Sequence, residues 1–390
     1  MKTKKVNSSR MPVYRDAGFE LFDASTTGKA FAKEPENERI PELYIYSRYR
    51  NPTVIAAEDE IINLEGCRWA LLTQSGMSAV DTALSVFQRG SLTRPWLFFN
   101  EIYGGTISFI ESVLKKRRGI EALSFYPSGE RYDTDEFARV AEREKPEVIY
   151  IEVVSNPMLI VTDLVEIIGI ARKTGSRVIV DNTFATPVLC RPLDLGADLV
   201  IHSATKYFSG HGNITAGVIC GNDDSLMREA IEYRKYVGHM ISPDDAYRLQ
   251  TQIKTFRLRF IQQCKNAAAI TSVLKSSRAV RKVWYPGLPE HETHSVALKL
   301  FADRGFGGMI TFDFAGGSAE EKRKKRDLFI SAVSEDIKII PSLGDPKTII
   351  MPVESVWGVK YPEPGLIRMS AGFEETEVIT AIVKEALGKL

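Results

Sequence analysis

Cysteine is scarce in this chain of 390 residues, and its four copies form no pattern. They are Cys67, Cys190, Cys220 and Cys264, and each is far from the next along the chain. This spacing excludes a disulfide-rich secreted scaffold and the paired-cysteine motifs of structural zinc sites. We therefore expect four reduced thiols.

Histidine is also rare, with five copies in the whole chain. His291 and His294 are close enough in sequence to suggest a shared metal ion, but their segment supplies no convincing third ligand. We interpret this segment as a polar loop and expect no metal site.

An excess of charge of one sign is missing, because the formal net charge is +1. Such a chain has no long-range field that would attract nucleic acid or an anionic membrane. A basic run at residues 322–326 contains no aromatic residue, so we interpret it as the solvated face of a helix. No nucleic-acid partner is expected.

Long apolar runs are missing too. No uninterrupted apolar stretch is long enough to cross a bilayer, and the basic residues of segment 1–10 are not followed by the apolar part of a secretory signal. We expect no membrane contact and a cytoplasmic location.

What is present is the composition of an ordinary globular protein, 44% hydrophobic and 26% charged, at a length that predicts two domains. Residues 1–52 are polar and show no sustained helical or strand period. We interpret them as an N-terminal arm whose aromatic end favours packing. Residues 53–255 are expected to form a large domain, and residues 256–390 a smaller α+β domain.

Alternating strands and helices dominate the large domain. Strands are predicted at 70–73, 96–99, 148–152, 178–181, 199–202 and 217–220, and helices at 54–64, 76–84, 105–114 and 164–174. Long amphipathic helices follow to residue 275, and further strands are predicted at 308–312 and 336–340. This alternation predicts an α/β fold with a mostly parallel sheet covered on both faces.

Lys206 and Asp181 carry the first chemical signal. Asp181 ends a β-branched run, and Lys206 follows the next predicted strand with hydroxyl residues Ser203 and Thr205 beside it. A lysine can form a Schiff base with the aldehyde of pyridoxal phosphate, while a buried carboxylate keeps the pyridine nitrogen protonated. Alone, each residue would be read as a strand cap or a surface lysine. Together, at strand ends where ligands bind in such sheets, they indicate a cofactor site.

A glycine turn joins the predicted strand at 70–73 to the helix that follows. The residues are Gln74, Ser75, Gly76 and Met77. The free backbone N–H groups at such a helix start form a site for an anion, which suits a phosphate group.

Seven motifs in this order give the chain a family resemblance. They are Tyr46-Ser47-Arg48, Asn51-Pro52-Thr53, Ser75-Gly76-Met77, Tyr103-Gly104-Gly105-Thr106, Asn156-Pro157, Asp181-Asn182-Thr183 and Ser203-Ala204-Thr205-Lys206. With them the chain resembles the cystathionine γ-synthase and γ-lyase family of Cys/Met metabolism. The resemblance runs from about Tyr46 to Glu374. It implies pyridoxal 5'-phosphate and fold type I, the aspartate aminotransferase-like transferase fold with a large and a small domain.

The resemblance also implies roles for the cofactor residues. Lys206 would bind the cofactor covalently and later move protons between Cα and the neighbouring carbons, while Asp181 would pair with the pyridinium nitrogen. The phosphate would be held by Gly76 and Met77 backbone amides and by Ser203 and Thr205 hydroxyls.

Further roles concern the ring and the substrate. Tyr103 would stack on the cofactor ring and serve as a second acid or base, and Thr183 would lie near the opposite ring face. Asn156 would contact the cofactor's 3′ oxygen or the substrate. Arg368 matches the arginine that grips the substrate α-carboxylate, and Ser342 matches the family's Ser-Leu-Gly turn.

Tyr46 and Arg48 match residues that in the family reach the phosphate of the neighbouring subunit. The resemblance therefore implies a homo-oligomer, with the tetramer built as a pair of dimers.

The sequence departs from the family pattern mainly around the substrate. Ser108 stands where several members place an arginine for the distal carboxyl group of cystathionine, and the loops at 153–155 and 345–352 are altered. Because no guanidinium is available at residue 108, we expect a substrate whose distal group is shorter or less acidic than that of cystathionine.

The resulting hypothesis is γ-elimination or γ-replacement on a sulfur-containing or O-activated L-amino acid. β-Elimination, as in a cystathionine β-lyase, uses the same residues and stays open. A cofactor-binding regulatory protein without turnover is the rival from another class. It is disfavoured because the full set of Lys206, Asp181, Tyr103 and Arg368 is present.

Overall fold

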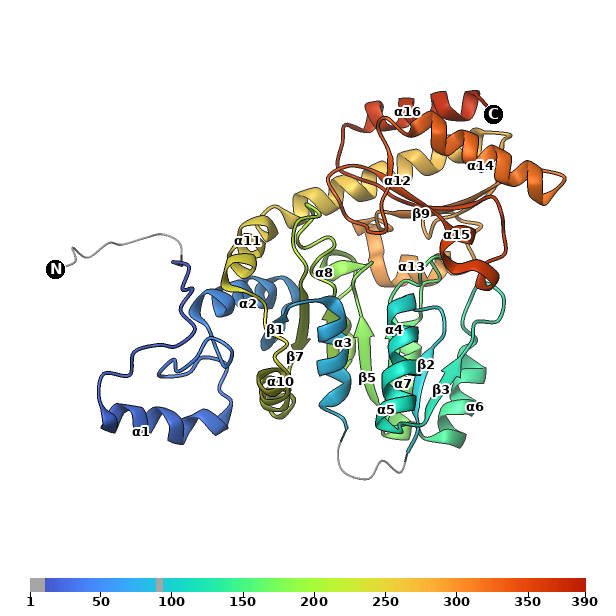
Figure 1. Ribbon diagram of the computed structural model, residues 1–390. Coiled ribbons are helices and arrows are strands. Elements are labelled where there is room, and N and C mark those ends of the chain that lie inside the picture. Colours follow the sequence, from blue (N-terminus) through green and yellow to red (C-terminus); the bar gives the residue numbers. More distant parts are fainter. Residues whose placement is uncertain (1–10, 89–93) are drawn as a thin grey trace.

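The computed structural model describes residues 11–88 and 94–390. A seven-stranded sheet in the order β1-β7-β6-β5-β4-β2-β3 organises the first part of the chain (Figure 1). Its strands are β1 (Trp69–Thr73), β2 (Trp96–Phe99), β3 (Ala122–Phe125), β4 (Val148–Glu152), β5 (Arg177–Asp181), β6 (Leu199–His202) and β7 (Gly217–Gly221). The strands from β3 to β6 pair in parallel, and β7 runs antiparallel to both of its neighbours. The predicted mostly parallel sheet is confirmed.

Helices accompany this sheet in alternation with its strands. They are α2 (Pro52–Glu65), α3 (Gly76–Ser85), α4 (Gly104–Phe109), α5 (Lys116–Arg118), α6 (Thr134–Glu144), α7 (Leu164–Thr174), α8 (Thr186–Leu189), α9 (Pro192–Leu195), α10 (Asp224–Val237) and α11 (Pro243–Ile253), with a π-helical segment at Ile110–Lys115 between α4 and α5. Every residue of β4 and β6 is buried, as expected of parallel strands covered on both faces.

A second sheet follows in the C-terminal part, in the order β10-β11-β12-β9-β8. Its strands are β8 (Val280–Trp284), β9 (Met309–Phe314), β10 (Lys338–Ile339), β11 (Ile349–Pro352) and β12 (Leu366–Ser370). Its helices are α12 (Phe256–Ser276), α13 (His294–Phe301), α14 (Ala319–Val333), α15 (Val353–Trp357) and α16 (Thr376–Gly388). Short 3-10 turns lie at Ala302–Arg304 and Gly358–Lys360 in this part of the chain, and at Glu34–Glu36 in the arm. Sequence patterns indicated only β9 and β10. The boundary proposed at residue 255 stays a prediction.

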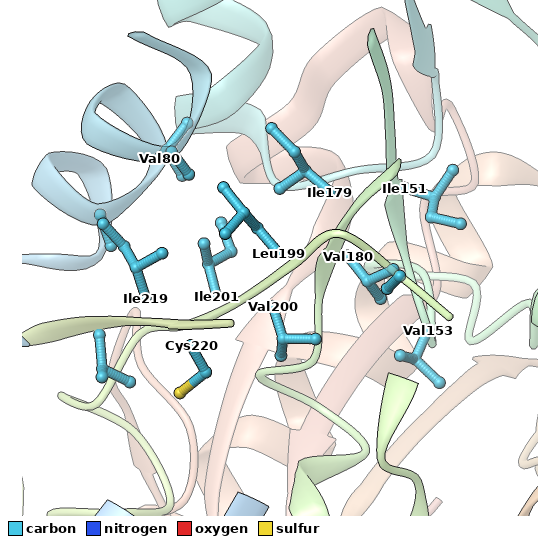
Figure 2. Packing of buried hydrophobic residues seen from close by; sticks show 14 of the residues in the cluster. Val80, Ile151, Val153, Ile179, Val180, Leu199, Val200, Ile201, Ile219 and Cys220 are labelled. Carbon is cyan, nitrogen blue, oxygen red and sulfur yellow. The ribbon is translucent and has the colours of Figure 1, made fainter. Parts of the chain in front are cut away.

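The core of the large sheet consists mainly of β-branched and leucine side chains from neighbouring strands. Figure 2 shows Val80, Ile151, Val153, Ile179, Val180, Leu199, Val200, Ile201, Ile219 and Cys220 packed around β4 to β7. Such residues suit a pleated surface that is buried on both faces. This core fixes the positions of β5 and β6. Asp181 ends β5, and Lys206 follows shortly after the end of β6.

The arm contains a helix that the sequence pattern did not predict. Helix α1 (Ala24–Lys33) starts at Asp23, whose side chain accepts a hydrogen bond from Thr26 N at 2.7 Å. A helix therefore forms in a segment whose sequence shows no sustained helical period, and the interpretation of residues 1–52 as an arm stays a prediction. The residue after α1, Glu34, contacts α10, because its Oε1 lies 2.5 Å from Lys235 Nζ. Figure 1 shows α1 set apart from the two sheets.

Two simple properties complete the fold. All four cysteines are unpaired and buried, in agreement with the expected reduced thiols. Across residues 11–88 and 94–390, no helix combines the length and apolarity that a membrane span requires.

Candidate active site

A cavity of about 260 Å³ lies at the carboxyl ends of the parallel strands. Its lining includes most of the predicted site residues, namely Gly76, Met77, Tyr103, Asn156, Asp181, Thr183, Ser203, Thr205, Lys206, Ser342 and Arg368. Residues from the first turn of α3, from the ends of β4, β5 and β6, and from the second sheet thus meet in one place. This is where open α/β sheets bind ligands.

Asp181 lies at the floor of this cavity, where β5 ends. Its carboxylate accepts hydrogen bonds from Thr183 N at 2.9 Å and from the Tyr150 hydroxyl at 3.3 Å. Burial raises the pKa of the Asp181 carboxyl above its ordinary value, although the Thr183 contacts oppose this shift. In the described part of the chain it forms no ion pair with a lysine or arginine. A cationic ligand atom would therefore be stabilised beside it.

Lys206 follows β6 in a tight turn, in which its N–H donates to Ser203 O at 3.1 Å. Its Nζ reaches across to the second sheet's connecting loop and donates to Ser342 Oγ at 3.1 Å. Burial, together with the charge of Arg368, lowers the pKa of the Lys206 amine. A larger fraction of neutral, nucleophilic amine is therefore present near neutral pH than in an exposed lysine.

Helix α3 begins at Gly76, within the glycine turn for which an anion site was predicted. Ser75 caps it and accepts a hydrogen bond from Ser78 N at 3.1 Å. A Cβ on Gly76 would lie 2.9 Å from Ser203 Cβ, so only glycine allows this close approach of α3 to the end of β6. The Thr205 hydroxyl at the same edge donates to Ala216 O at 3.1 Å.

Thr183 connects the two strand ends. Its Oγ1 accepts a hydrogen bond from Ser203 N at 2.9 Å, while its own N–H donates to Asp181. Thr183, which the family resemblance places near the cofactor ring, therefore also fixes the position of Ser203.

Arg368 on β12 forms the opposite wall and is only 6% exposed. Its Nη1 donates to Asn156 Oδ1 at 3.0 Å and its Nη2 to Ser342 O at 3.0 Å. Its Nε is buried without a hydrogen-bond partner in the described part of the chain. Burial lowers the pKa of the guanidinium to about 10, so the group remains charged at neutral pH. A carboxylate would satisfy this buried cation.

Tyr103 stands at the start of α4 with 51% of its surface exposed. Its backbone N–H donates to Glu152 Oε1 at 2.6 Å. Glu152 was not predicted as a site residue, yet it lines the cavity beside Asp181. Burial and the nearby Asp181 charge raise the pKa of Glu152 well above its ordinary value. Its position at the carboxyl end of a buried strand, like that of Asp181, was the signal that could have identified it.

Tyr46 and Arg48 lie outside the cavity of their own chain. Tyr46 is 41% exposed, and Arg48 Nη1 donates to Lys235 O at 2.8 Å. Ser108 is exposed on α4 and does not line the cavity either.

Comparison with known proteins agrees with this geometry. The model of the family described as Cys/Met metabolism PLP-dependent enzyme matches residues 1–388. An L-methionine gamma-lyase of Porphyromonas gingivalis is 33% identical, covering 97% of this chain and 92% of the relative. A cystathionine beta-lyase of Lactococcus lactis is 36% identical, covering 90% of each chain.

A solved structure of cystathionine gamma synthase from Xanthomonas oryzae matches with a TM-score of 0.84 and 27% identity, covering 97% of this chain and 92% of the other. A cystathionine gamma-lyase from Lactobacillus plantarum, complexed with L-serine, matches with a TM-score of 0.82 and 28% identity, over 97% and 93% of the two chains. With a family match over nearly its whole length and a cavity that unites the expected residues, the chain belongs to the Cys/Met metabolism PLP-dependent enzymes.

Proposed function

We propose that this protein catalyses γ-elimination or γ-replacement on a sulfur-containing or O-activated L-amino acid, with pyridoxal 5'-phosphate as cofactor. The observation that carries the proposal is the shared cavity of Lys206, Asp181 and Arg368. These side chains supply a nucleophilic amine, a buried carboxylate and a buried carboxylate-binding cation. An amino-acid substrate needs all three around the cofactor.

The lining residues fit this cofactor. Asp181 is a buried carboxylate whose pKa is raised by burial, so a protonated ring nitrogen would give it a cation. The first amides of α3, at Gly76 and Met77, lack acceptors within the helix and suit a phosphate. Lys206 Nζ lies in the same cavity and would hold the aldehyde carbon.

Arg368 would orient the substrate through its α-carboxylate. Its planar guanidinium can donate two parallel hydrogen bonds to such a group, and its Nε has no partner yet in the described part of the chain. Asn156 and Ser342 O hold the guanidinium in place. The amino acid would therefore enter with Cα facing Lys206.

Proton transfer would be carried by Lys206 and Tyr103. When bound, pyridoxal phosphate accepts the electron pair left at Cα after its proton is removed. Lys206 Nζ, whose pKa is lowered, would take that proton and pass it along the substrate chain. Tyr103 lines the cavity and is half exposed, and its hydroxyl would donate a proton to the leaving group.

β-Elimination is the second candidate because the 36% identical relative is a cystathionine beta-lyase. Both reactions use the same cavity residues. They differ in the keto acid formed, since γ-elimination yields α-ketobutyrate and β-elimination yields pyruvate.

The test is an assay of purified holoenzyme against methionine, cystathionine, O-acetylhomoserine and cysteine. We expect α-ketobutyrate, ammonia and a thiol from at least one of them, and neither keto acid from Lys206→Ala. Pyruvate alone would move the assignment to β-elimination. A protein that binds the cofactor at Lys206 yet forms neither a keto acid nor, with an added thiol, a γ-replacement product would contradict the proposal.

We also propose that the active enzyme is an oligomer in which Tyr46 and Arg48 serve the cofactor phosphate of a neighbouring subunit. The proposal is supported by their motif match and by their position outside their own chain's cavity.

A further inference from the structure

The segment after β11 crosses from the second sheet to the edge of the active site. Helix α15 ends at Trp357, and the following 3-10 turn is attached to the end of β2. There Lys360 Nζ donates to Asn100 O at 3.1 Å, and the Tyr361 hydroxyl donates to Glu101. These contacts hold Trp357 beside the cavity.

Trp357 is not among the residues that line the cavity, but it packs beside Arg368, which does, and close to Gly104 at the start of α4. Its ring centroid lies 5.7 Å from Arg368 Cζ, above the group proposed to bind the α-carboxylate. Its Nε1 would lie 3.8 Å from a Cβ on Gly104, the residue directly after Tyr103. The ring of Tyr361 supports it edge-on, with centroids 6.4 Å apart.

Besides Arg368, the cation that these contacts bring near Trp357 is Lys360, which is already paired. Lys360 already lies 3.4 Å from Glu101 Oε1, and residue 108 on α4 is a serine. A distal amino-acid head, as in cystathionine, would therefore leave its carboxylate unpaired against an indole, which carries a free-energy cost. A short thioether would instead gain apolar contact with the ring.

We propose that Trp357 is a specificity-determining residue that favours amino acids with a short, uncharged distal group over cystathionine. The inference rests on the proposed function, since it assumes that Arg368 binds the α-carboxylate of an amino-acid substrate. It assigns to Trp357 the wall against which the distal group packs.

The decisive experiment compares kcat/KM for methionine and for cystathionine in the holoenzyme. In Trp357→Ala the ratio of the two values should fall on the order of tenfold, because methionine loses its apolar wall while cystathionine gains room. Trp357→Phe should keep the ratio near that of the wild type. Val356→Ala, an exposed neighbour on α15, is the matched control and should change nothing.

A purely structural role would lower both kcat/KM values equally and leave their ratio unchanged, which would overturn the proposal. Trp357 also packs against the buried cluster of Val353, Tyr361 and Leu366, so the alanine variant could fail to fold. In that case Trp357→Gln decides, because it keeps a side chain of intermediate size but removes the apolar wall, and an unchanged ratio in this variant would contradict the proposal equally well.

Binding of unreactive amino acids separates this inference from the proposed reaction. Norleucine has the length of methionine without a leaving group, and 2-aminopimelate ends in a second carboxylate. Cofactor absorbance should report tighter binding of norleucine in the wild type and loss of this preference in Trp357→Ala. If the wild type forms neither a keto acid nor a γ-replacement product but shows this preference, the reaction proposal fails and the role of Trp357 stands. Equal binding of norleucine and 2-aminopimelate by the wild type would refute the role of Trp357.

Discussion

Lys206 Nζ and Ser342 Oγ lie 3.1 Å apart, although 136 residues separate them in sequence. One belongs to the turn after β6 and the other to the loop between β10 and β11. The same Ser342 accepts a hydrogen bond from Arg368 through its carbonyl oxygen. The amine proposed to bind the cofactor and the cation proposed to bind the substrate are therefore both held by one residue.

The ionisation of Lys206 gives the first prediction. Burial and then the Arg368 charge lower the pKa of its amine below the ordinary 10.5. Because the neutral amine reacts with an aldehyde, the rate of cofactor binding to the apoenzyme should rise with pH around a midpoint below 10.5. Arg368→Met removes the second cause and should move the midpoint upward, although burial keeps it below 10.5. Stopped-flow absorbance would measure the rates.

The exposed Arg257, which has no ion-pair partner in the described part of the chain, provides the control for this measurement. Arg257→Met should leave the midpoint where it is in the wild type. An unshifted midpoint in Arg368→Met would show that the Arg368 charge does not reach the amine.

Asp181→Asn should affect the apoenzyme and the holoenzyme in opposite directions. Burial raises the folded-state pKa of Asp181, so its contribution to stability is present at low pH and is lost as the pH rises through that pKa. At pH 7 the apoenzyme of the variant should therefore melt at an equal or higher temperature, and this difference should shrink toward pH 4. Differential scanning calorimetry at both pH values measures it.

The holoenzyme of the same variant should be impaired. Without the carboxylate beside the ring nitrogen, cofactor addition should raise the melting temperature less than in the wild type, and kcat should fall on the order of 100-fold. A full cofactor-induced shift together with unchanged kcat would rule out the role of Asp181.

Gly76→Ala tests the close approach of α3 to β6. Its Cβ would meet Ser203 Cβ at 2.9 Å, so the helix start must shift away from the phosphate site. We expect a destabilisation of about 1 to 3 kcal/mol and weaker cofactor binding. Gly169→Ala on α7 is the matched control, because its Cβ would meet nothing within 4 Å and should stabilise by about 0.5 to 1 kcal/mol. Urea unfolding and cofactor titration of both variants measure these effects.

Local signals made much of the large sheet predictable. The helix predicted at 164–174 has these bounds as α7, because the Asp163 side chain caps its start and Gly175 ends it in the left-handed region. The helix of the arm was missed because its sequence combines Thr26, Thr27 and Gly28, which favour other conformations. Strand β12 was indicated only through Arg368, which matches the family, and its neighbour β11 was not recognised.

The candidate site, too, could be predicted only in part from local sequence signals. Asp181 and Lys206 could be found because each follows a recognisable strand. The contact between Arg368 and Asn156 joins residues 212 positions apart, and no periodicity in the sequence encodes such a pairing. Only the resemblance to known enzymes indicated both residues. Trp357 had neither signal, since it follows no motif and its place depends on how α15 packs.

Arg48 allows a test of oligomeric assembly by mixing two inactive variants. Within its own chain its guanidinium lies 5.0 Å from the Tyr49 ring centroid and donates to the carbonyl of Lys235, away from the cavity. If it serves a neighbouring subunit, a dimer of one Lys206→Ala chain and one Arg48→Ala chain contains one site with both residues intact. Random mixing should restore about a quarter of wild-type activity, since half the dimers are mixed and each has one good site.

A double variant carrying both substitutions provides the control for this mixture. Combined with Lys206→Ala, it offers no site in which both residues are intact, so activity should stay at background. If Arg48 acted within its own chain, mixing the single variants would restore nothing beyond the sum of the two parents. In that case the arm would have to fold back onto its own cavity, which would break the contacts of Arg48 with Tyr49 and Lys235.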